Sequence, residues 1–468
     1  MHTESMTLDG RPAPSERVFE VINPATGRPF ATAPECSRSQ CDQAMRSAEH
    51  GFCSWAATSV AARRSALRRI ADTTDQAASD LAFVLTREQG KPLRAARFEV
   101  QQVSRWFRHF AEMPLPVEVA QDDAIGYAEV VRRPLGVVAA ITPWNFPLLL
   151  MAMKVAPALL AGNAVVLKPS PYTPLSTLAF GRLAAPHLPA GVLNVVSGGN
   201  ELGAWMTAHP VVRKVSFTGS VPTGKAVAMA AAADLKRCTL ELGGNDAAIV
   251  LADADPRQVL PGLFWGAFTN NGQVCAGIKR LYVPDRLHDD LLGLLAEKAR
   301  AVRVGDGMEE GVQLGPVNNL PQLQRIGQLV DEAIASGARV AAGGAAIAGD
   351  GYFFQPTVLH DLGEGCRLVD EEQFGPVLPV LRYSDLDEAI ARANATRYGL
   401  SGSVWGRNAD RAEQIARRLH CGTIYVNTHL VSTPSLPFGG WQWSGLGVEN
   451  GARGLDEFCQ LQVTYRPH

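Results

Sequence analysis

The stretch "LGVVAAITPWNFPLLLMAMKVAPALLAGNAVVLKPS", residues 135–170, decides the fold class. It begins with a short run rich in Val, Ala and Ile, continues through an apolar segment of helix length with Pro147 near its start, and ends in a second Val- and Leu-rich run. Two short buried strands that flank a helix form a βαβ unit, in which the strands run parallel. The stretch therefore predicts a parallel sheet.

The same alternation of strand-like and helix-length segments continues on both sides of residue 244. Residues 191–199, 213–220 and 238–244 read as further strands, and a second set runs from "DAAIVL" to "GTIYVN", residues 246–427. This pattern predicts an α/β protein with two doubly wound parallel-sheet domains and a ligand site beyond the carboxyl ends of the strands. Isolated strands near residue 128 and at 458–468 predict a small β arm that pairs with another subunit.

Charge and composition exclude several classes of protein. The chain has 468 residues, of which 46% are hydrophobic, and its 44 Lys and Arg against 46 Asp and Glu leave a net charge of −2. Such a chain has no global field for a polyanion, so nucleic-acid binding would need a local basic patch. The one candidate patch comprises Arg63, Arg64, Arg68 and Arg69, which we interpret as a solvated helix face.

The sequence also argues against a membrane protein and a metal site. Its first ten residues lack an apolar signal segment, and Lys154, Pro157 and Asn163 interrupt the most apolar region. The eight cysteines form no C-x-x-C pair and have no His partner at zinc spacing. We therefore expect a cytoplasmic protein with reduced thiols and no bound metal.

Cys275 is the strongest candidate for a reactive group. It ends the polar approach "FTNNGQVCAG", residues 268–277. A thiol near its reference pKa of about 8.5 is a few per cent thiolate at neutral pH and is strongly nucleophilic. A buried core cysteine is the alternative, and only neighbouring segments decide between the two.

Asn145 and Glu241 stand at the ends of predicted strands, and Glu372 stands in a predicted turn. Asn145 in "TPWNFP" offers an amide that can donate to an oxyanion, and Glu241 in "LELGGND" is a carboxylate that is costly to bury without a task, such as that of a general base. Glu372 in "EEQFGPV" can accept hydroxyl hydrogen bonds, while Phe374 beside it can stack on a flat ring. A turn or loop residue is the plain alternative for each one alone.

A further segment, "GSVPTGKA", nearly matches a P-loop. Its last position, Ala226, has no hydroxyl for magnesium, and Pro222 lacks a backbone N–H, so an NTPase is disfavoured. Gly219 and Ser220 still lie between a strand and a helix, where backbone N–H groups can meet a phosphate. The usual G-x-G-x-x-G fingerprint is absent.

Together these segments resemble the aldehyde dehydrogenase superfamily over essentially the whole chain, from "INPATG" near residue 22 to "PFGGWQWSGLG" and the terminal strand. The resemblance implies a dinucleotide-binding domain over residues 1–114 and 135–243. It implies a catalytic domain over 244–442 and an oligomerisation arm over 115–134 and 443–468, which would build a homodimer or a homotetramer.

The resemblance also assigns roles to residues. Cys275 becomes the nucleophile and Glu241 the general base; the Asn145 amide and the Cys275 backbone N–H become the oxyanion hole, and Lys154 supports the site. The cofactor would be NAD. NADP remains an alternative, because Pro171 stands where many NAD-dependent members carry Glu. The implied cofactor contacts are Thr142, Trp144, Lys168, Ser170, Gly198, Phe217, Gly219, Ser220, Gly243, Glu372 and Phe374.

The expected substrate is an uncharged aliphatic or aromatic aldehyde. Succinic semialdehyde dehydrogenases typically carry an arginine where this chain has Met153, and residues 427–440 contain no Lys or Arg. A semialdehyde is the alternative substrate. An acylating enzyme that uses coenzyme A is disfavoured by Glu241, and a non-catalytic relative by the presence of Cys275, Glu241 and Asn145. By resemblance the substrate tunnel is lined by Phe146, Leu150, Met153, Trp265 and Phe438.

Overall fold

The βαβ unit predicted from residues 135–170 is present in the computed structural model, which describes residues 2–468. Strands β8 (Val137–Ile141) and β9 (Ala164–Lys168) pair in parallel, and α5 (Pro147–Ala161) connects them. Pro147 suits the first turn of α5, where no N–H is needed, and Gly162 ends the helix with a φ of 99°. All five residues of each strand are buried, which explains their continuous apolar runs.

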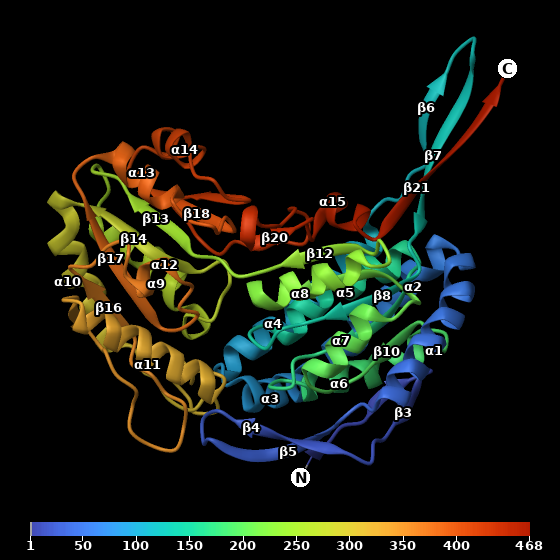
Figure 1. Cartoon of the computed structure of the whole chain (residues 1–468), viewed down its shortest axis with the longest axis horizontal. Coiled ribbons are helices and arrows are strands. Elements are labelled where there is room, and N and C mark those ends of the chain that lie inside the picture. The colour runs from blue at the N-terminus through green and yellow to red at the C-terminus, as the bar shows by residue number, and fades with distance from the viewer. Residues whose placement is uncertain (1) are drawn as a thin grey trace.

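The first sheet has eight strands in the order β20-β12-β11-β8-β9-β10-β2-β3. The strands from β12 to β10 are parallel, whereas β20 and β2 join antiparallel. Helices lie on this sheet (Figure 1). The remaining strands are β20 (Gly445–Leu446), β12 (Arg237–Glu241), β11 (Val212–Thr218), β10 (Leu193–Val195), β2 (Met6–Leu8) and β3 (Arg11–Ala13), and the helices are α1 (Arg38–Ala57), α2 (Val60–Gln76), α3 (Ala78–Gln89), α4 (Leu93–Glu112), α6 (Leu175–Ala184), α7 (Asn200–Ala208) and α8 (Val221–Ala232).

The second sheet has seven strands in the order β15-β16-β17-β14-β13-β18-β19 and forms a separate lobe (Figure 1). All its pairs are parallel except β15 with β16, so the predicted α/β class with two parallel-sheet domains is confirmed. Its strands are β13 (Asp246–Val250), β14 (Ile278–Pro284), β15 (Arg339–Ala342), β16 (Thr357–His360), β17 (Val377–Tyr383), β18 (Ser401–Trp405) and β19 (Thr423–Val426), and its helices are α9 (Pro256–Phe268), α10 (Asp285–Ala301), α11 (Leu320–Ala335), α12 (Arg367–Asp370), α13 (Leu386–Asn394) and α14 (Ala409–Ala416).

Three antiparallel strands, β6 (Glu118–Asp122), β7 (Gly126–Pro134) and β21 (Cys459–Pro467), project from the first lobe as an arm (Figure 1). The arm was expected to include all of residues 443–468, and this limit is wrong. Strand β20 pairs with β12 in the first sheet, and α15 (Gly451–Asp456) follows it, so β21 alone represents this segment in the arm. The other domain limits stay predictions. A small sheet of β1 (His2–Thr3), β5 (Arg28–Pro34) and β4 (Val18–Asn23) completes the chain.

The basic run on α2 is not a uniformly solvated face, contrary to the sequence-based interpretation. Arg63 is 7% exposed and its guanidinium donates to the Ala161 carbonyl at the end of α5. Arg68 is half exposed and pairs with Glu112 at 2.6 Å. Arg63 therefore serves packing within the first lobe, whereas Arg68 and Arg69 stay at the surface. Within residues 2–468, no helix combines the length and apolarity that crossing a membrane requires.

The carboxyl ends of the central strands meet at one edge of the first sheet. Thr218 on β11 lies opposite Glu241 on β12, and Ile141 on β8 lies opposite Lys168 on β9. The chain then crosses from Glu241 to Asp246, the first residue of β13 in the second sheet. This edge therefore faces the second lobe, where a parallel sheet places its ligands.

Candidate active site

A cleft of about 610 Å³ lies between the two lobes and contains Cys275. Of the residues predicted for the site, the cleft wall also contains Trp144, Asn145, Gly219, Ser220, Gly243, Glu372 and Phe374. The other lining residues are Pro143, Thr218, Val221, Pro222, Leu242, Gln322, Arg325, Glu371, Tyr398 and Trp443.

Cys275 ends a tightly wound loop. Asn270, Asn271 and Gly272 adopt φ values of 50°, 60° and 70°, a left-handed run that is rare for residues with a Cβ. Lys279, fully buried on β14, holds this loop by donating to the carbonyls of Gly272 at 2.8 Å and Val274 at 2.9 Å. The polar approach seen in the sequence is therefore the frame that fixes the thiol.

The surroundings of Cys275 shift the pKa of its thiol away from that of a free cysteine. Burial, followed by the carboxylates of Glu372, Glu241 and Asp246, raises the pKa of Cys275 to about 12, although Lys279 opposes the shift. Negative charge nearby disfavours a thiolate. In this conformation the thiol is protonated at neutral pH, and it needs a base before it can act as a nucleophile.

Asn145 is 2% exposed and is fixed on both sides. Its Nδ2 donates to the Gln273 carbonyl, two residues before Cys275, at 2.9 Å. The main-chain carbonyl of Asn145 accepts from the Lys91 Nζ at 2.9 Å and from the Asn270 Nδ2 at 3.0 Å. An amide nitrogen carries two hydrogens, so a second N–H stays available for an oxyanion beside Cys275.

Glu241 is 3% exposed, and neither of its carboxylate oxygens has a hydrogen-bond partner among the described residues. Burial, then the charge of Glu449, raises its pKa well above that of an exposed glutamate, while Lys154 opposes the shift. Lys154 is fully buried; it forms an ion pair with Glu449 and donates to the Thr218 hydroxyl at 2.7 Å. A buried carboxylate without partners is poised to take a proton.

The opposite part of the cleft fits a dinucleotide. Ser220 caps α8, and Gly219 precedes it, so the start of a 12-residue helix faces the cleft where a diphosphate can bind. The ring of Trp144 meets that of Phe374 edge to face at 5.2 Å. Glu372 accepts from the Gly244 N–H at 3.2 Å, and a side chain at position 243 would collide with its carboxylate.

The chain is similar to known proteins over nearly its whole length. A model of the aldehyde dehydrogenase family matches residues 11–464. The chain belongs to the aldehyde dehydrogenase family. It is 36% identical over 457 residues to glutarate-semialdehyde dehydrogenase of Pseudomonas putida, covering 96% of this chain and 94% of that protein. It is 37% identical over 460 residues to aldehyde dehydrogenase LUC3 of a Fusarium species, covering 98% and 97%.

A solved structure agrees with the family assignment. The aldehyde dehydrogenase from Bacillus cereus, in its NAD⁺ complex, superposes with a TM-score of 0.97 at 33% identity, over 100% of this chain and 97% of that one. The chain is therefore an NAD(P)-dependent oxidoreductase that acts on aldehydes.

Five residues predicted to bind the cofactor of this aldehyde dehydrogenase lie outside the cleft wall. Lys168 is 4% exposed, and burial lowers its pKa to about 8. Among residues 2–468 its Nζ donates a single, long hydrogen bond of 3.3 Å, to the Pro169 carbonyl. The other four are buried near the ends of strands in the first sheet and stay predictions: Thr142, Ser170, Gly198 and Phe217.

Of the residues predicted to line the substrate tunnel, Phe438 lines a cavity, whereas the other four lie outside both that cavity and the cleft. Phe438 lines a separate space of about 260 Å³. Met153 is 4% exposed, and Phe146 lies under Lys91, whose Nζ is 4.0 Å from the ring centroid. Leu150 and Trp265 are partly buried. The tunnel remains a prediction.

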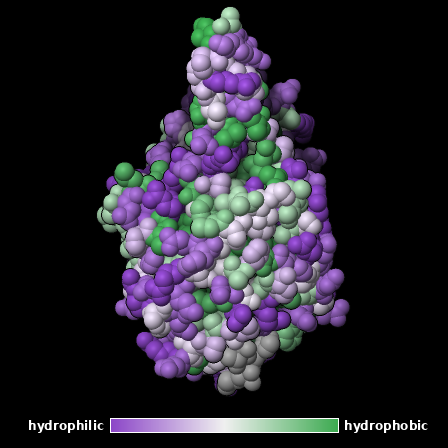
Figure 2. Space-filling view, turned by 90° about the vertical axis from the view of Figure 1, so that its right-hand side faces the viewer, coloured by the Kyte–Doolittle hydropathy of each residue, from purple (hydrophilic) through white to green (hydrophobic). Residues whose placement is uncertain are grey.

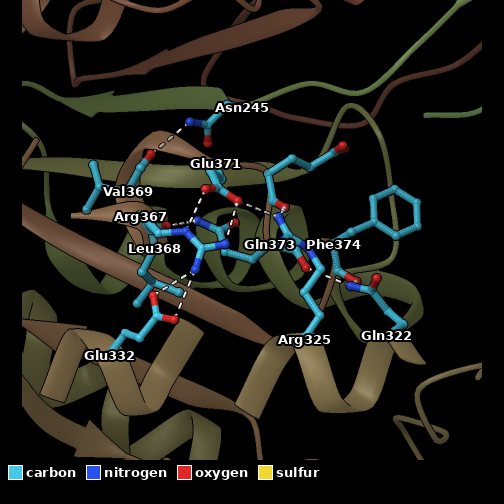
Figure 3. Close-up of polar contacts among 11 residues, drawn as sticks. Asn245, Gln322, Arg325, Glu332, Arg367, Leu368, Val369, Glu371, Gln373 and Phe374 are labelled. Carbon is cyan, nitrogen blue, oxygen red and sulfur yellow. Dashed lines mark hydrogen bonds and ion pairs between the residues drawn. The ribbon is translucent and has the colours of Figure 1, made fainter. Parts of the chain in front are cut away.

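Sequence reasoning missed the residues that hold the site from behind. Gln322 on α11 donates to the carbonyls of Gln373 at 2.8 Å and Phe374 at 3.0 Å, and Arg325 donates to the Glu372 carbonyl at 3.1 Å (Figure 3). Phe374 itself has a φ of 50°. No pattern around residues 320–325 signals this role, because the partners lie about fifty residues further along the chain.

Proposed function

We propose that the enzyme oxidises an aldehyde to the carboxylic acid through a thioester on Cys275. The observation that carries this proposal is that Cys275, Asn145 and Glu372 line one cleft, with the amide of Asn145 bonded to the loop that carries the thiol. An adduct on Cys275 would therefore form next to a fixed donor and within reach of the cofactor end of the same cleft.

In the first half of the reaction, the Cys275 thiol loses its proton and the sulfur bonds to the aldehyde carbon. The raised pKa of Glu241 makes its carboxylate a stronger base than an exposed glutamate, which suits it to receive a proton at this site. The Asn145 N–H and the Cys275 backbone N–H stabilise the oxyanion. When bound, the nicotinamide ring supplies a hydride acceptor, and Glu372 would orient its ribose.

In the second half, water replaces sulfur on the acyl carbon. Glu241 first releases the thiol proton to solvent; it then takes a proton from the water that attacks the thioester, and the same donors stabilise the second tetrahedral oxyanion. The thiol then regains its proton as the acid leaves. Lys154 and Glu449 form a buried ion pair beside Glu241. Because each of the two already has a partner of opposite charge, gain or loss of a proton by Glu241 leaves neither of them unpaired.

We propose an uncharged aliphatic or aromatic aldehyde as substrate. Lys91 beside Phe146 is paired with Glu99 and already donates to the Asn145 carbonyl, so it cannot serve a substrate carboxylate. His429 lies in the loop before "PFGG" and contacts the Ala276 carbonyl at 2.8 Å; burial lowers its pKa to about 4, so it is neutral. The likeness to glutarate-semialdehyde dehydrogenase favours a semialdehyde as the second candidate.

NAD is the proposed cofactor, with NADP as the alternative. Pro171 provides no carboxylate that would repel a 2'-phosphate, and the Lys168 Nζ has no carboxylate partner among the described residues. Below pH 8 the lysine is a cation and would attract that phosphate.

The arm supports a homodimer or a homotetramer. Leu461, Val463 and Tyr465 on β21 are 67%, 63% and 51% exposed, and β21 is an edge strand with one unpaired side. Figure 2, in which the arm rises at the top, shows hydrophobic surface at its base. An exposed apolar edge strand favours pairing with a second chain. Light scattering of the full chain and of Val463→Lys tests this, since a monomeric wild type would contradict it.

The test of the main proposal is reduction of NAD or NADP by the purified enzyme with aliphatic, aromatic and semialdehyde substrates. Activity should vanish in Cys275→Ala and persist in Cys53→Ala, a matched change at an exposed thiol on α1. An active Cys275→Ala variant would overturn the mechanism, and glutarate semialdehyde as the best substrate would overturn the uncharged assignment.

A further inference from the structure

We propose that Arg325, together with the ion-pair chain behind it, positions Glu372 for the ribose of the cofactor. The chain comprises Arg325, Glu371, Arg367 and Glu332. The inference rests on the proposed role of Glu372 in binding the ribose. In it, Glu372 is held in place by side chains that no sequence pattern singles out.

Glu372 has few contacts of its own. Its carboxylate accepts one backbone N–H, from Gly244 at 3.2 Å, and faces Gly243, which has no side chain to restrain it. Its position is therefore set by its main chain. The main-chain carbonyl of Glu372 accepts from the Arg325 Nη2 at 3.1 Å, so this guanidinium holds the residue directly.

Arg325 also holds the preceding residue. The same Nη2 donates to the Glu371 carboxylate at 3.0 Å, a charge-assisted bond of the stronger kind. One guanidinium therefore fixes two consecutive residues of the loop. Gln322, one turn earlier on α11, fixes the next two through the carbonyls of Gln373 and Phe374, so the loop is bonded to one helix over four residues.

The chain of ion pairs begins and ends on α11. Glu371 accepts from the Arg367 Nε at 2.7 Å, and Arg367 donates to both oxygens of Glu332 at 3.0 and 2.9 Å. Glu332 lies on α11, seven residues and about two turns after Arg325, on the same face of the helix. Figure 3 shows the resulting ring of side chains under the loop. Neither Arg325 nor Glu371 can turn away without breaking it.

The charge of Arg325, like its hydrogen bonds, supports the role of Glu372 in ribose binding. Burial raises the pKa of Glu372 to about 7, and the nearby charges of Lys279 and Arg325 oppose this shift. Arg325 thus favours the carboxylate form, which accepts hydroxyl hydrogen bonds best. The arginine supports both the place and the ionisation of the group.

Arg367 separates this role from direct cofactor contact. Arg325 and Glu371 line the cleft and could touch the cofactor themselves, whereas Arg367 is not part of the cleft wall. Arg367 reaches the cofactor only through Glu371. If removal of the Arg367 side chain weakens cofactor binding in a way that depends on Glu372, the effect must be transmitted through Glu371 and Arg325.

The experiment measures the dissociation constant of NADH, or of NADPH if it binds better, by fluorescence titration. The variants are Glu372→Gln, Arg325→Met, Arg325→Lys, Arg367→Met and the doubles of Glu372→Gln with each methionine change. Arg418→Met, which removes a surface pair with Asp387, is the matched control. Thermal midpoints check folding, and the alkylation rate of Cys275 checks the nucleophile loop.

We expect Arg325→Met to weaken binding about tenfold and Arg325→Lys by less, because the lysine keeps the charge and one donor. Arg367→Met should weaken binding about two- to threefold, as partly exposed pairs contribute little. Both effects should disappear in the Glu372→Gln background, with Cys275 alkylation unchanged. Additive doubles would overturn the inference, because Arg325 would then act on the cofactor directly or on the fold as a whole.

The Glu372→Gln variant distinguishes a failure of the proposed ribose contact from a failure of the positioning role of Arg325. If Glu372→Gln binds the cofactor as tightly as the wild type, the ribose role of Glu372 is wrong and the inference falls with it. If Glu372→Gln weakens binding but Arg325→Met and Arg367→Met do not, the inference alone is wrong and the proposed function stands.

Discussion

Gly272 and Gly375 pack backbone against backbone: a methyl group on Gly272 would collide with the Gly375 carbonyl oxygen. The loop that carries the thiol and the loop that carries Glu372 therefore touch where neither has a side chain. With a φ of 70°, Gly272 is also in a conformation that alanine rarely adopts.

We predict that Gly272→Ala lowers the thermal midpoint and abolishes most activity, because strain of about 1 to 3 kcal/mol or movement of the Cys275 loop must follow. Differential scanning fluorimetry and initial rates measure both effects. Gly293→Ala is the control with the opposite sign. Gly293 lies on the exposed face of α10 with open space around it, so alanine there should stabilise by up to about 1 kcal/mol. Equal midpoints for both variants would contradict the prediction.

Removal of the Asn145 amide should lower kcat by roughly 10²- to 10³-fold in Asn145→Ala, by analogy with other oxyanion donors. The KM for the aldehyde should change little, because the donor acts on charge that develops during reaction. Steady-state kinetics with the best aldehyde of the panel decide this. A kcat within a fewfold of the wild type would remove Asn145 from the oxyanion hole.

Glu241→Gln should slow thioester hydrolysis more than its formation: the amide cannot take a proton from the attacking water, whereas the thiol is a stronger acid than water and can still lose its proton to solvent. Rapid mixing should then show a burst of reduced cofactor of about one equivalent per active site, followed by slow turnover. Intact-mass analysis should find the acyl group on Cys275. Slow turnover without a burst or an acylated protein would contradict the role of Glu241 in hydrolysis.

The raised pKa of Cys275 predicts slow alkylation of the cofactor-free enzyme. With a pKa of about 12, its reaction with iodoacetamide at pH 8 should be much slower than that of the exposed Cys53. The Cys275 rate should rise about tenfold for each pH unit, because the thiolate fraction does so below the pKa. Peptide mass spectrometry follows both sites in one sample. Faster labelling of Cys275 than of Cys53 would show that the thiol is not held neutral.

Lys168 predicts a pH dependence that separates the two cofactors. Burial lowers its pKa to about 8, so the cation is present below pH 8 and is lost above it. If NADP binds, its KM should rise as the pH passes through 8, while the KM for NAD changes less because NAD has no 2'-phosphate. Lys168→Met should remove the difference. Parallel profiles for both cofactors in the wild type would exclude an electrostatic role for Lys168.

The fold was predictable where local pattern and global arrangement agree. Buried parallel strands make continuous apolar runs, so residues 135–170 predict the βαβ unit correctly. The family resemblance, not local pattern, implied that Asn145 and Cys275 lie together, and both line the same cleft. The short strand β20 was not predictable. Two residues have no periodicity, and only the free edge of β12 makes them a strand.

Sequence pattern could not supply the electrostatics of the site. The pKa of Cys275 depends on Glu372 and Asp246, which reach the thiol only in the folded chain. Likewise Arg63 belongs to a run that looks solvated, yet it is buried against α5 by the packing of two helices. Long-range contacts of single side chains leave no trace in spacing or composition.

The pairing of Lys154 with Glu449 sets an order of events during protein synthesis. The two residues are 295 positions apart, so at typical rates of translation the lysine leaves the ribosome roughly 15 to 60 s before its partner. Until then Lys154 lacks its ion-pair partner, and β12 has an open edge that awaits β20. The lobe whose synthesis begins first is thus completed last, when β20 joins β12 and Glu449 reaches Lys154.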